Sequence, residues 1–165
     1  MASDLSNDQA APSNPVPGMV QLVVNAQYVK DLSFENPRAP QSLIDQKQPE
    51  VALNVDVSAN RLAPDVYEVS LTLGANAKAG GEAIFMVELI YAAVVTITGA
   101  SEDQLAQMIL VDTPYMLFPY ARSIVSNATR DGGFPPLMIN PIDFGELLRR
   151  QKAEGQKPGN GTAFA

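Results

Sequence analysis

The side chains that could carry acid–base chemistry in this sequence are mainly carboxylates, because its 165 residues include neither Cys nor His. The absence of Cys excludes thiolate nucleophiles and every zinc site that needs sulfur. The absence of His removes the commonest general base, the Ser-His-Asp arrangement and the commonest metal ligand. Catalysis would have to rely on carboxylates and lysine, so the composition argues against an enzyme.

The carboxylates stand mostly where predicted helices begin and end. Asp103 and Asp112 flank one such helix, and Asp143 and Glu146 lie at the start of another. Helix caps and solvated faces explain these positions, and nothing indicates the close pair that glycoside hydrolysis needs. Phosphate loops, dinucleotide fingerprints and metal-ligand spacings are also missing from the sequence. It therefore predicts no catalytic residue, no cofactor and no metal site.

The charge and the apolar pattern limit the partners. A formal net charge of −7 disfavours phosphate backbones and favours basic partners. The N-terminus has no basic region followed by an apolar one. The most apolar stretch, residues 83–100, contains Glu88 and many β-branched residues, which is typical of a strand. These features predict a cytoplasmic protein that binds no nucleic acid and inserts into no membrane.

One domain between two tails is the predicted organisation. Residues 1–18 are rich in Ser, Asn, Ala and Pro, and residues 152–165 are rich in Gly, Lys and Gln. Both compositions favour disorder. Residues 19–151 remain for a single domain, which is long enough to bury one core.

Alternating apolar and polar residues predict four strands. The first runs from Val20 to Tyr28 and is followed by a Pro-rich loop over residues 31–49. The other strands are predicted over 51–57, 66–77 and 82–98, and a hairpin loop at 76–81 joins the last two. Because residues 82–98 are apolar on both faces, we expect this strand to be covered on both sides.

Helical periodicity replaces alternation after residue 100. Ser101 is the predicted N-cap of a helix that ends or is interrupted at Pro114. A longer helix is predicted over 117–130, with Pro119 in its first turn and Gly132-Gly133 after its end.

Asp143-Phe144-Gly145-Glu146 resembles a capping box that begins a last helix. Strands followed by helices predict the α+β class, a four-stranded antiparallel sheet with helices packed on one face. A single layer of helices covers only one face of such a sheet. Self-association is the simplest cover for the other face.

From about Val20 to Arg150 the sequence closely resembles SecB, the bacterial protein-export chaperone family. The stretches that carry the resemblance are Tyr28-Val-Lys-Asp-Leu-Ser-Phe-Glu-Asn-Pro37, Gln48-Pro-Glu50, Asp65-Val-Tyr-Glu-Val69, Leu117-Phe-Pro-Tyr-Ala-Arg122 and Gly133-Phe-Pro-Pro-Leu137. The resemblance implies an ATP-independent chaperone that binds unfolded preproteins in the cytoplasm, keeps them competent for translocation and delivers them to SecA, the translocation ATPase. It also implies a homotetramer, arranged as a dimer of dimers.

The same resemblance implies roles for individual residues. The acidic pair of the Lys-Asp-x-Ser-Phe-Glu motif would contact SecA together with two residues of the fourth strand, which gives Asp31, Glu35, Met86 and Glu88. The alternate positions of that strand resemble those that join dimers into tetramers, which gives Val87, Leu89 and Tyr91. One position departs from the family, since Lys47 stands where relatives often have Trp in a loop associated with the client groove.

Four aromatic residues, Tyr115, Phe118, Tyr120 and Phe134, leave two interpretations open. They could belong to the core, or they could line a groove for extended peptides. Two alternative functions are also considered. A structural oligomer without a client would not bind denatured protein, and a small carboxylate-based enzyme would need a pocket with converging acids of shifted pKa.

Overall fold

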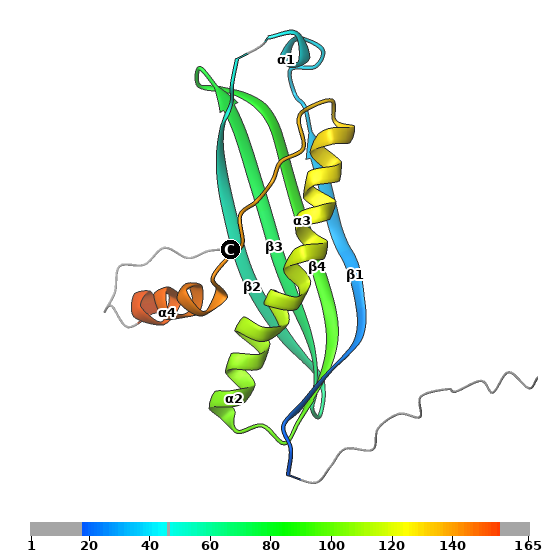
Figure 1. The fold of residues 1–165 in the computed structure, drawn as a ribbon, viewed down its shortest axis with the longest axis vertical. Helices are drawn as coiled ribbons and strands as arrows, with labels where there is room; N and C mark the ends of the chain where they lie inside the picture. Colours follow the sequence, from blue (N-terminus) through cyan, green and yellow to red (C-terminus); the bar gives the residue numbers. More distant parts are fainter. Residues whose placement is uncertain (1–17, 46, 156–165) are drawn as a thin grey trace, which may run out of the picture.

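One antiparallel sheet and one layer of helices form the fold, as the sequence predicts (Figure 1). The computed structural model describes residues 18–45 and 47–155. The four strands are β1 (Gln21–Glu35), β2 (Glu50–Ala63), β3 (Val66–Ala79) and β4 (Glu82–Thr98), in the sheet order β1-β4-β3-β2. β4 and β3 are therefore the central strands, and β1 and β2 form the two edges.

The β3–β4 hairpin is tighter than the predicted loop over residues 76–81. Ala79 pairs with Glu82, so Gly80 and Gly81 alone form the turn. Their φ angles are 58° and 83°, as a type I′ turn requires, and glycine adopts them without strain. Both strands therefore extend to the turn, and β4 has the predicted bounds of residues 82–98.

Strand β1 is longer than predicted because two bulges interrupt its alternation. It continues to Glu35 instead of ending at Tyr28. Its pairing with β4 shifts between Val24 and Ala26 and again between Val29 and Asp31. Each bulge adds one residue, so the side chains that follow it point to the opposite face. The predicted loop over 31–49 is accordingly shorter, and it contains the one-turn helix α1 (Gln41–Ile44).

The helices α2 (Glu102–Gln107) and α3 (Thr113–Asp131) are joined by the π-helical turn η1 (Met108–Asp112) and cross the sheet diagonally (Figure 1). The prediction that Pro114 ends or interrupts the helix is wrong. Proline donates no backbone hydrogen bond, and the wider π turn just before Pro114 keeps the helical segment continuous. Because α3 begins at Thr113, Pro119 lies inside the helix and not in its first turn.

The predicted caps are confirmed in part. Ser101 and Gln104 form a complete capping box at the start of α2, and Gly132 is the C-cap of α3. At the start of α4 (Phe144–Gly155), the Glu146 amide donates to the Asp143 carboxylate at 2.9 Å. The Glu146 side chain does not complete a second capping box, because it pairs with two arginines of its own helix, Arg149 and Arg150.

Helix α4 also changes the predicted C-terminal boundary. It runs through Gly155, so residues 152–155 are helical and do not belong to a tail. Figure 1 shows that α4 extends away from the sheet beyond β2. Residues 1–17 and 156–165 of the predicted tails lie outside the described residues.

The hydrophobic core lies between the helices and one face of β3 and β4. We call this side of the sheet, which carries Leu71, Val87 and Leu89, the covered face. Leu71 and Leu89 are 0% exposed, and so is Leu117 of α3, which belongs to the same cluster. The opposite side, which carries Gly74 and Glu88, is called the open face.

Candidate functional site

An apolar cavity of about 550 Å³ opens at the end of the molecule that carries α1. Its floor comes from Ile84 and Phe85 of β4 and Val51 of β2, and its walls come from residues 133–138, 42–43, 45 and 47–49. Several large apolar side chains around it face solvent, namely Leu43, Ile44, Val51 and Met138. An exposed apolar surface around a cleft of this size fits a ligand that is itself apolar.

Three phenylalanines and two glycines shape the cavity. The rings of Phe34, Phe85 and Phe134 form one cluster, with centroids 4.9–6.3 Å apart. A Cβ added to Gly132 would overlap the Phe34 ring, and one added to Gly133 would lie 3.0 Å from Leu43 Cδ2. The glycine pair therefore lets the end of α3 pack closely against β1 and α1. The predicted turn residues have a second role as spacers.

Of the four aromatic residues proposed for a groove, only Phe134 lines the cavity. Phe118 is 6% exposed and packs edge-on against Phe144 of α4, so the core interpretation holds for it. Tyr115 and Tyr120 are exposed on the outer side of α3. The Tyr120 ring stacks on Tyr91 at a centroid distance of 6.3 Å. The four residues thus fall into three environments, and they do not form one groove.

Sequence reasoning missed most of the cavity. Leu43, Val51 and Met138 line it, but none belongs to the aromatic set. Leu43 and Met138 lie in Pro-rich segments outside the strands, for which the sequence predicts no regular element. The available signal was that large apolar residues occur in these segments, where no predicted strand or helix accounts for them.

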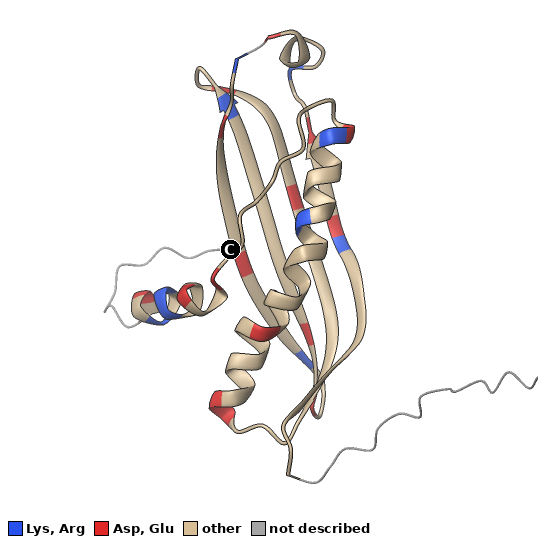
Figure 2. Ribbon diagram, viewed as in Figure 1, with Lys and Arg blue, Asp and Glu red and all other residues tan. Residues whose placement is uncertain are grey.

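The open face carries the four residues that the family resemblance assigned to SecA. Glu35 pairs with Met86, Ser33 with Glu88, and Asp31 with Ile90. Directly opposed residues of antiparallel strands point to the same face, so these acids share one side of the sheet. Asp31, Glu35 and Glu88 are exposed, and Met86 is half-buried. Figure 2 shows acidic positions on the neighbouring strands β1 and β4.

A shallow hollow of about 230 Å³ lies among these residues. Glu88 is opposite Gly74 on β3, and Gly74 is opposite Asn54 on β2. Because Gly74 has no side chain, the sheet surface is lowered between them. The hollow is lined by Ser33, Glu35, Asn54, Gly74, Asn76, Met86, Val87 and Glu88. Three of the four proposed SecA-contacting residues therefore meet in one depression, and Asp31 lies outside it on the same face.

Val87, Leu89 and Tyr91, to which the resemblance assigned the tetramer contacts, are buried within the single chain. Val87 is 3% exposed, Leu89 is 0% exposed and Tyr91 is 8% exposed. All three lie on the covered face, where the helices of the same chain pack on them. Burial raises the pKa of Tyr91, and its hydroxyl donates to the Gln27 side chain at 3.3 Å. The single chain leaves little of these three side chains exposed, and their assignment to tetramer contacts stays a prediction.

A polar cluster crosses the open face from β1 to β3. The Tyr28 hydroxyl donates to the Glu68 carboxylate, and Lys30 Nζ lies 2.6 Å from it. Tyr28 reaches across β4 at Ala92, its direct partner on that strand. The hydrogen bonds from Lys30 and Tyr28 lower the pKa of Glu68. The hydrogen bond between Tyr28 and Glu68 also raises the pKa of Tyr28. The sequence pattern did not predict the cluster, because the two bulges of β1 change which residues of this strand point to the open face.

The two carboxylates whose pKa is lowered, Glu68 and Glu146, lie on different elements and do not form a converging pair. Glu68 lies on β3 and Glu146 on α4, and the pKa of each is lowered by hydrogen bonds to neighbouring side chains, above all Lys30 and Arg149 respectively. Within residues 18–45 and 47–155, no three metal-ligating side chains come together. Over the same residues, no helix combines the length and the apolar character that a membrane span requires.

The sequence matches a family model described as preprotein translocase subunit SecB over residues 16–155. A protein-export protein SecB of Bradyrhizobium sp. strain BTAi1 is 46% identical over 158 residues, which covers 95% of this chain and 93% of that protein. A protein-export protein SecB of Rhodospirillum centenum is 52% identical over 132 residues and covers 79% of both chains.

Among solved structures, the fold is similar to a SecB-like chaperone of Mycobacterium tuberculosis in complex with a ChAD peptide from the antitoxin HigA1. The TM-score is 0.61, the sequence identity is 16%, and the match covers 73% of this chain and 90% of that chain. At this identity the likeness supports the four-stranded fold.

Proposed function

The chain belongs to the SecB family of preprotein translocase subunits, which are chaperones of protein export, and on this premise we propose that its apolar cavity holds unfolded segments of preproteins. The cavity itself is the observation that carries the proposal. Its floor is apolar, most of its wall residues are apolar, and exposed apolar side chains surround it. A folded protein keeps such side chains inside, whereas an unfolded chain exposes them and can bury them here.

Binding of this kind needs no nucleotide. Each contact contributes on the order of 25 cal/mol per Å² of apolar surface removed from water, so one segment binds weakly. Several cavities in one assembly can hold different segments of the same client, and the high effective concentration makes the total binding tight. We infer that the protein acts in the cytoplasm, without ATP and without catalysis, and that release follows from transfer to a partner.

We propose that the open face docks that partner, the translocation ATPase SecA. Three acids and Met86 share this face, and neither Glu35 nor Glu88 forms an ion pair with another described residue. The cavity floor uses Ile84 and Phe85, whereas the hollow uses the next residues of the same strand, Met86 to Glu88. Client and partner would therefore bind at opposite sides of one strand end without competing for the same side chains.

We also propose that the protein is a homotetramer, with contacts different from those first assigned. The edge strand β1 exposes Val29 and Leu32 on the covered face. Val29 pairs with Tyr91, and the exposed Tyr120 of α3 stacks on Tyr91. Sedimentation should then give four times 17.6 kDa. Leu32→Glu should lower that mass, whereas Val23→Glu, on the opposite face of β1, should leave it unchanged. A wild-type monomer at micromolar concentration would exclude the assembly.

The client proposal is tested by diluting an unfolded secretory precursor with and without this protein and following light scattering. The protein should suppress aggregation without added ATP. The double variant Leu43→Glu/Met138→Glu should lose most of this effect, because it places two charges at the apolar rim. Leu62→Glu is the matched control, since Leu62 is equally exposed but lies at the other end of β2. Equal suppression by all three proteins would contradict the cavity as the binding site.

The docking proposal is tested by the double reversal Asp31→Lys/Glu35→Lys. Binding to SecA should be abolished, and binding by the wild-type protein should weaken as salt rises, because exposed charges are screened. Holdase activity and assembly mass should stay unchanged. Asp131→Lys/Glu154→Lys makes the same change in net charge at two exposed helical positions and should leave docking intact. SecA affinity that survives the first reversal would refute the assignment.

A further inference from the structure

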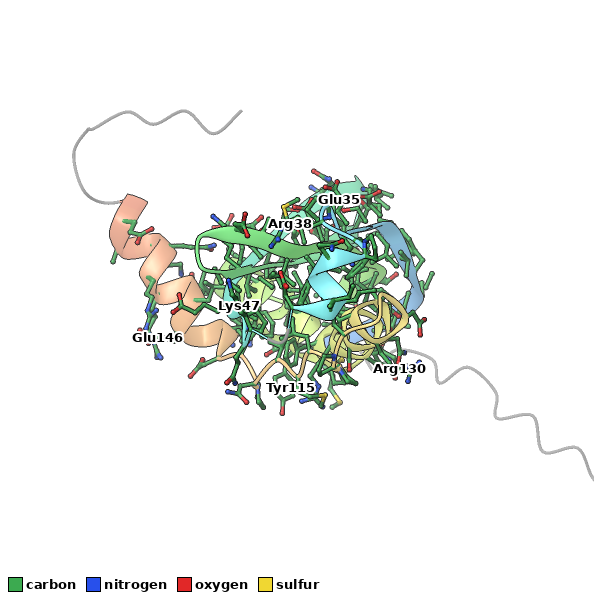
Figure 3. The ribbon with its side chains drawn as sticks, turned by 90° about the horizontal axis from the view of Figure 1, so that it is seen from above. Glu35, Arg38, Lys47, Tyr115, Arg130 and Glu146 are labelled. Atoms are coloured by element: carbon green, nitrogen blue, oxygen red, sulfur yellow. The ribbon has the colours of Figure 1, made fainter. Side chains whose placement is uncertain are left out.

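Two charged side chains line the apolar cavity, and their surroundings differ. The Asp45 carboxylate lies 3.5 Å from the Arg38 guanidinium, which lies 2.8 Å from the Glu82 carboxylate. Lys47 lines the same cavity but makes no ion pair within residues 18–45 and 47–155. Figure 3 looks onto this end of the molecule and labels both Arg38 and Lys47. The cavity thus carries an exposed cation that has no counter-ion among the described residues.

The chemistry of lysine suits a position at the edge of an apolar site. Its methylene stem can lie along an apolar wall while the ammonium group stays in water. The ammonium is a mobile point charge with three donors, so it can meet a carboxylate in several geometries. An extended chain advances about 3.3 Å per residue. A carboxylate one or two residues from a side chain held in the cavity therefore lies within reach of Lys47.

We propose that Lys47 makes this cavity prefer unfolded segments in which an Asp or Glu lies one or two residues from an apolar anchor. The inference rests on the proposed function of the cavity and adds a rule for the clients that it takes. The formal net charge of −7 repels acidic segments at long range. A preference for acidic flanks must therefore come from a local contact, and Lys47 supplies it. An exposed ion pair of this kind changes Kd by up to about five-fold.

The experiment uses the full chain and three fluorescent peptides that share a Phe-Leu-Phe anchor and differ only in the flanking residue, which is Asp, Asn or Lys. Anisotropy titrations at low salt should give the lowest Kd for the Asp peptide, two- to five-fold below that of the nearly isosteric Asn peptide. Lys47→Gln should bring the Kd values of the Asp and Asn peptides together. Lys47→Glu should reverse the order and favour the Lys peptide. Lys152→Glu, the same charge change on α4, should keep the wild-type order.

The outcomes separate this inference from the proposed function. If the Asn peptide binds, and Leu43→Glu/Met138→Glu weakens it, the cavity is the client site. Equal Kd values for the Asp and Asn peptides would then overturn the role of Lys47 alone. The same reversal by Lys152→Glu would also overturn it, because the effect would belong to net charge. If the Asn peptide does not bind, or binds the double variant equally well, the cavity proposal fails and this inference fails with it.

Discussion

The covered and open faces of the sheet are made by alternate residues of the same strands, yet their characters are opposite. On the covered face of β4, Val87 and Leu89 are buried under the helices, while their neighbour Glu88 is exposed on the open face. Alternate residues of a strand point to opposite sides. A shift of one residue along β4 therefore separates a core position from a position that we propose to bind the partner. Whether a β4 residue is buried or exposed therefore depends on the face to which its side chain points, more than on how far along the strand it lies.

The largest expected difference between the faces concerns stability. Leu89→Ala should lower the free energy of unfolding by about 3–5 kcal/mol, because it leaves a cavity in a fully packed core. Glu88→Ala should change the same quantity by no more than about 0.5 kcal/mol, since an exposed side chain is removed. Urea unfolding followed by circular dichroism measures both. Similar losses for the two variants would mean that the open face is packed against something in solution.

A glycine substitution on the packed side should have the next largest effect. A Cβ at Gly132 overlaps the Phe34 ring, so Gly132→Ala should cost about 1–3 kcal/mol through overpacking. Client binding should fall as well, because the aromatic cluster under the cavity must shift. Gly155→Ala is the control, since nothing lies within 4 Å of its added Cβ. An unchanged midpoint of unfolding for Gly132→Ala would show that Phe34 moves freely.

The corresponding substitution on the open face should have the opposite sign. A Cβ at Gly74 would lie 3.6 Å from Asn54 Cβ, an ordinary contact, so Gly74→Ala should fold and gain about 0.5–1 kcal/mol through the lower entropy of the unfolded chain. It should nevertheless weaken SecA binding, because it fills the hollow beside Glu88. Calorimetry and a binding titration on the same sample test both statements. Tighter docking by this variant would show that the hollow takes no part.

The smallest expected effect is a dependence on pH. The pKa of Glu68 is lowered by its hydrogen bonds to Lys30 and Tyr28, below the value of about 4.3 that a free Glu has. Such a group stabilises the fold above its unfolded pKa, and this contribution is lost as the pH falls through the lower folded pKa. Because the pair is partly exposed, the effect should stay below about 1 kcal/mol. In Glu68→Gln, the free energy of unfolding should fall less steeply with pH below about pH 4.3 than in the wild type. Identical pH profiles of the two proteins would contradict a contribution from Glu68.

The sequence predicted the fold well where simple periods persist. β4 has the predicted bounds, because glycines with positive φ stand at both of its ends and its pairing with β3 shifts only once, at Ile84. The predicted first strand ends too early, because bulges at Asn25 and Lys30 twice change which face of the sheet the next side chain points to. A simple alternation of apolar and polar residues cannot continue through two such changes. Helix α3 starts earlier than predicted because the π turn before Pro114 lets the helix continue.

The candidate site was less predictable than the fold. The grouping of Asp31, Glu35, Met86 and Glu88 on one face follows from the register, but only the pairing of β1 with β4 fixes that register. The walls of the cavity come from the one-turn helix α1 and from irregular segments such as residues 47–49 and 133–138, which are too short or too irregular to carry a periodic signal. Alternation along β4 showed two apolar faces, but it could not say which one meets the helices of its own chain.

The register of β1 also determines the order of events during synthesis. Gln21 pairs with Thr98 and Glu35 with Met86, so β1 leaves the ribosome long before its partner strand β4. The 77 residues from Leu22 to Thr98 take about 4–15 s to translate at 5–20 residues per second. During that interval Val29 and Leu32 have no sheet to join, and this chaperone is itself a nascent chain with an unpaired apolar strand. Stalled chains that end within β4 should expose β1 to protease, whereas chains that have released Thr98 should protect it.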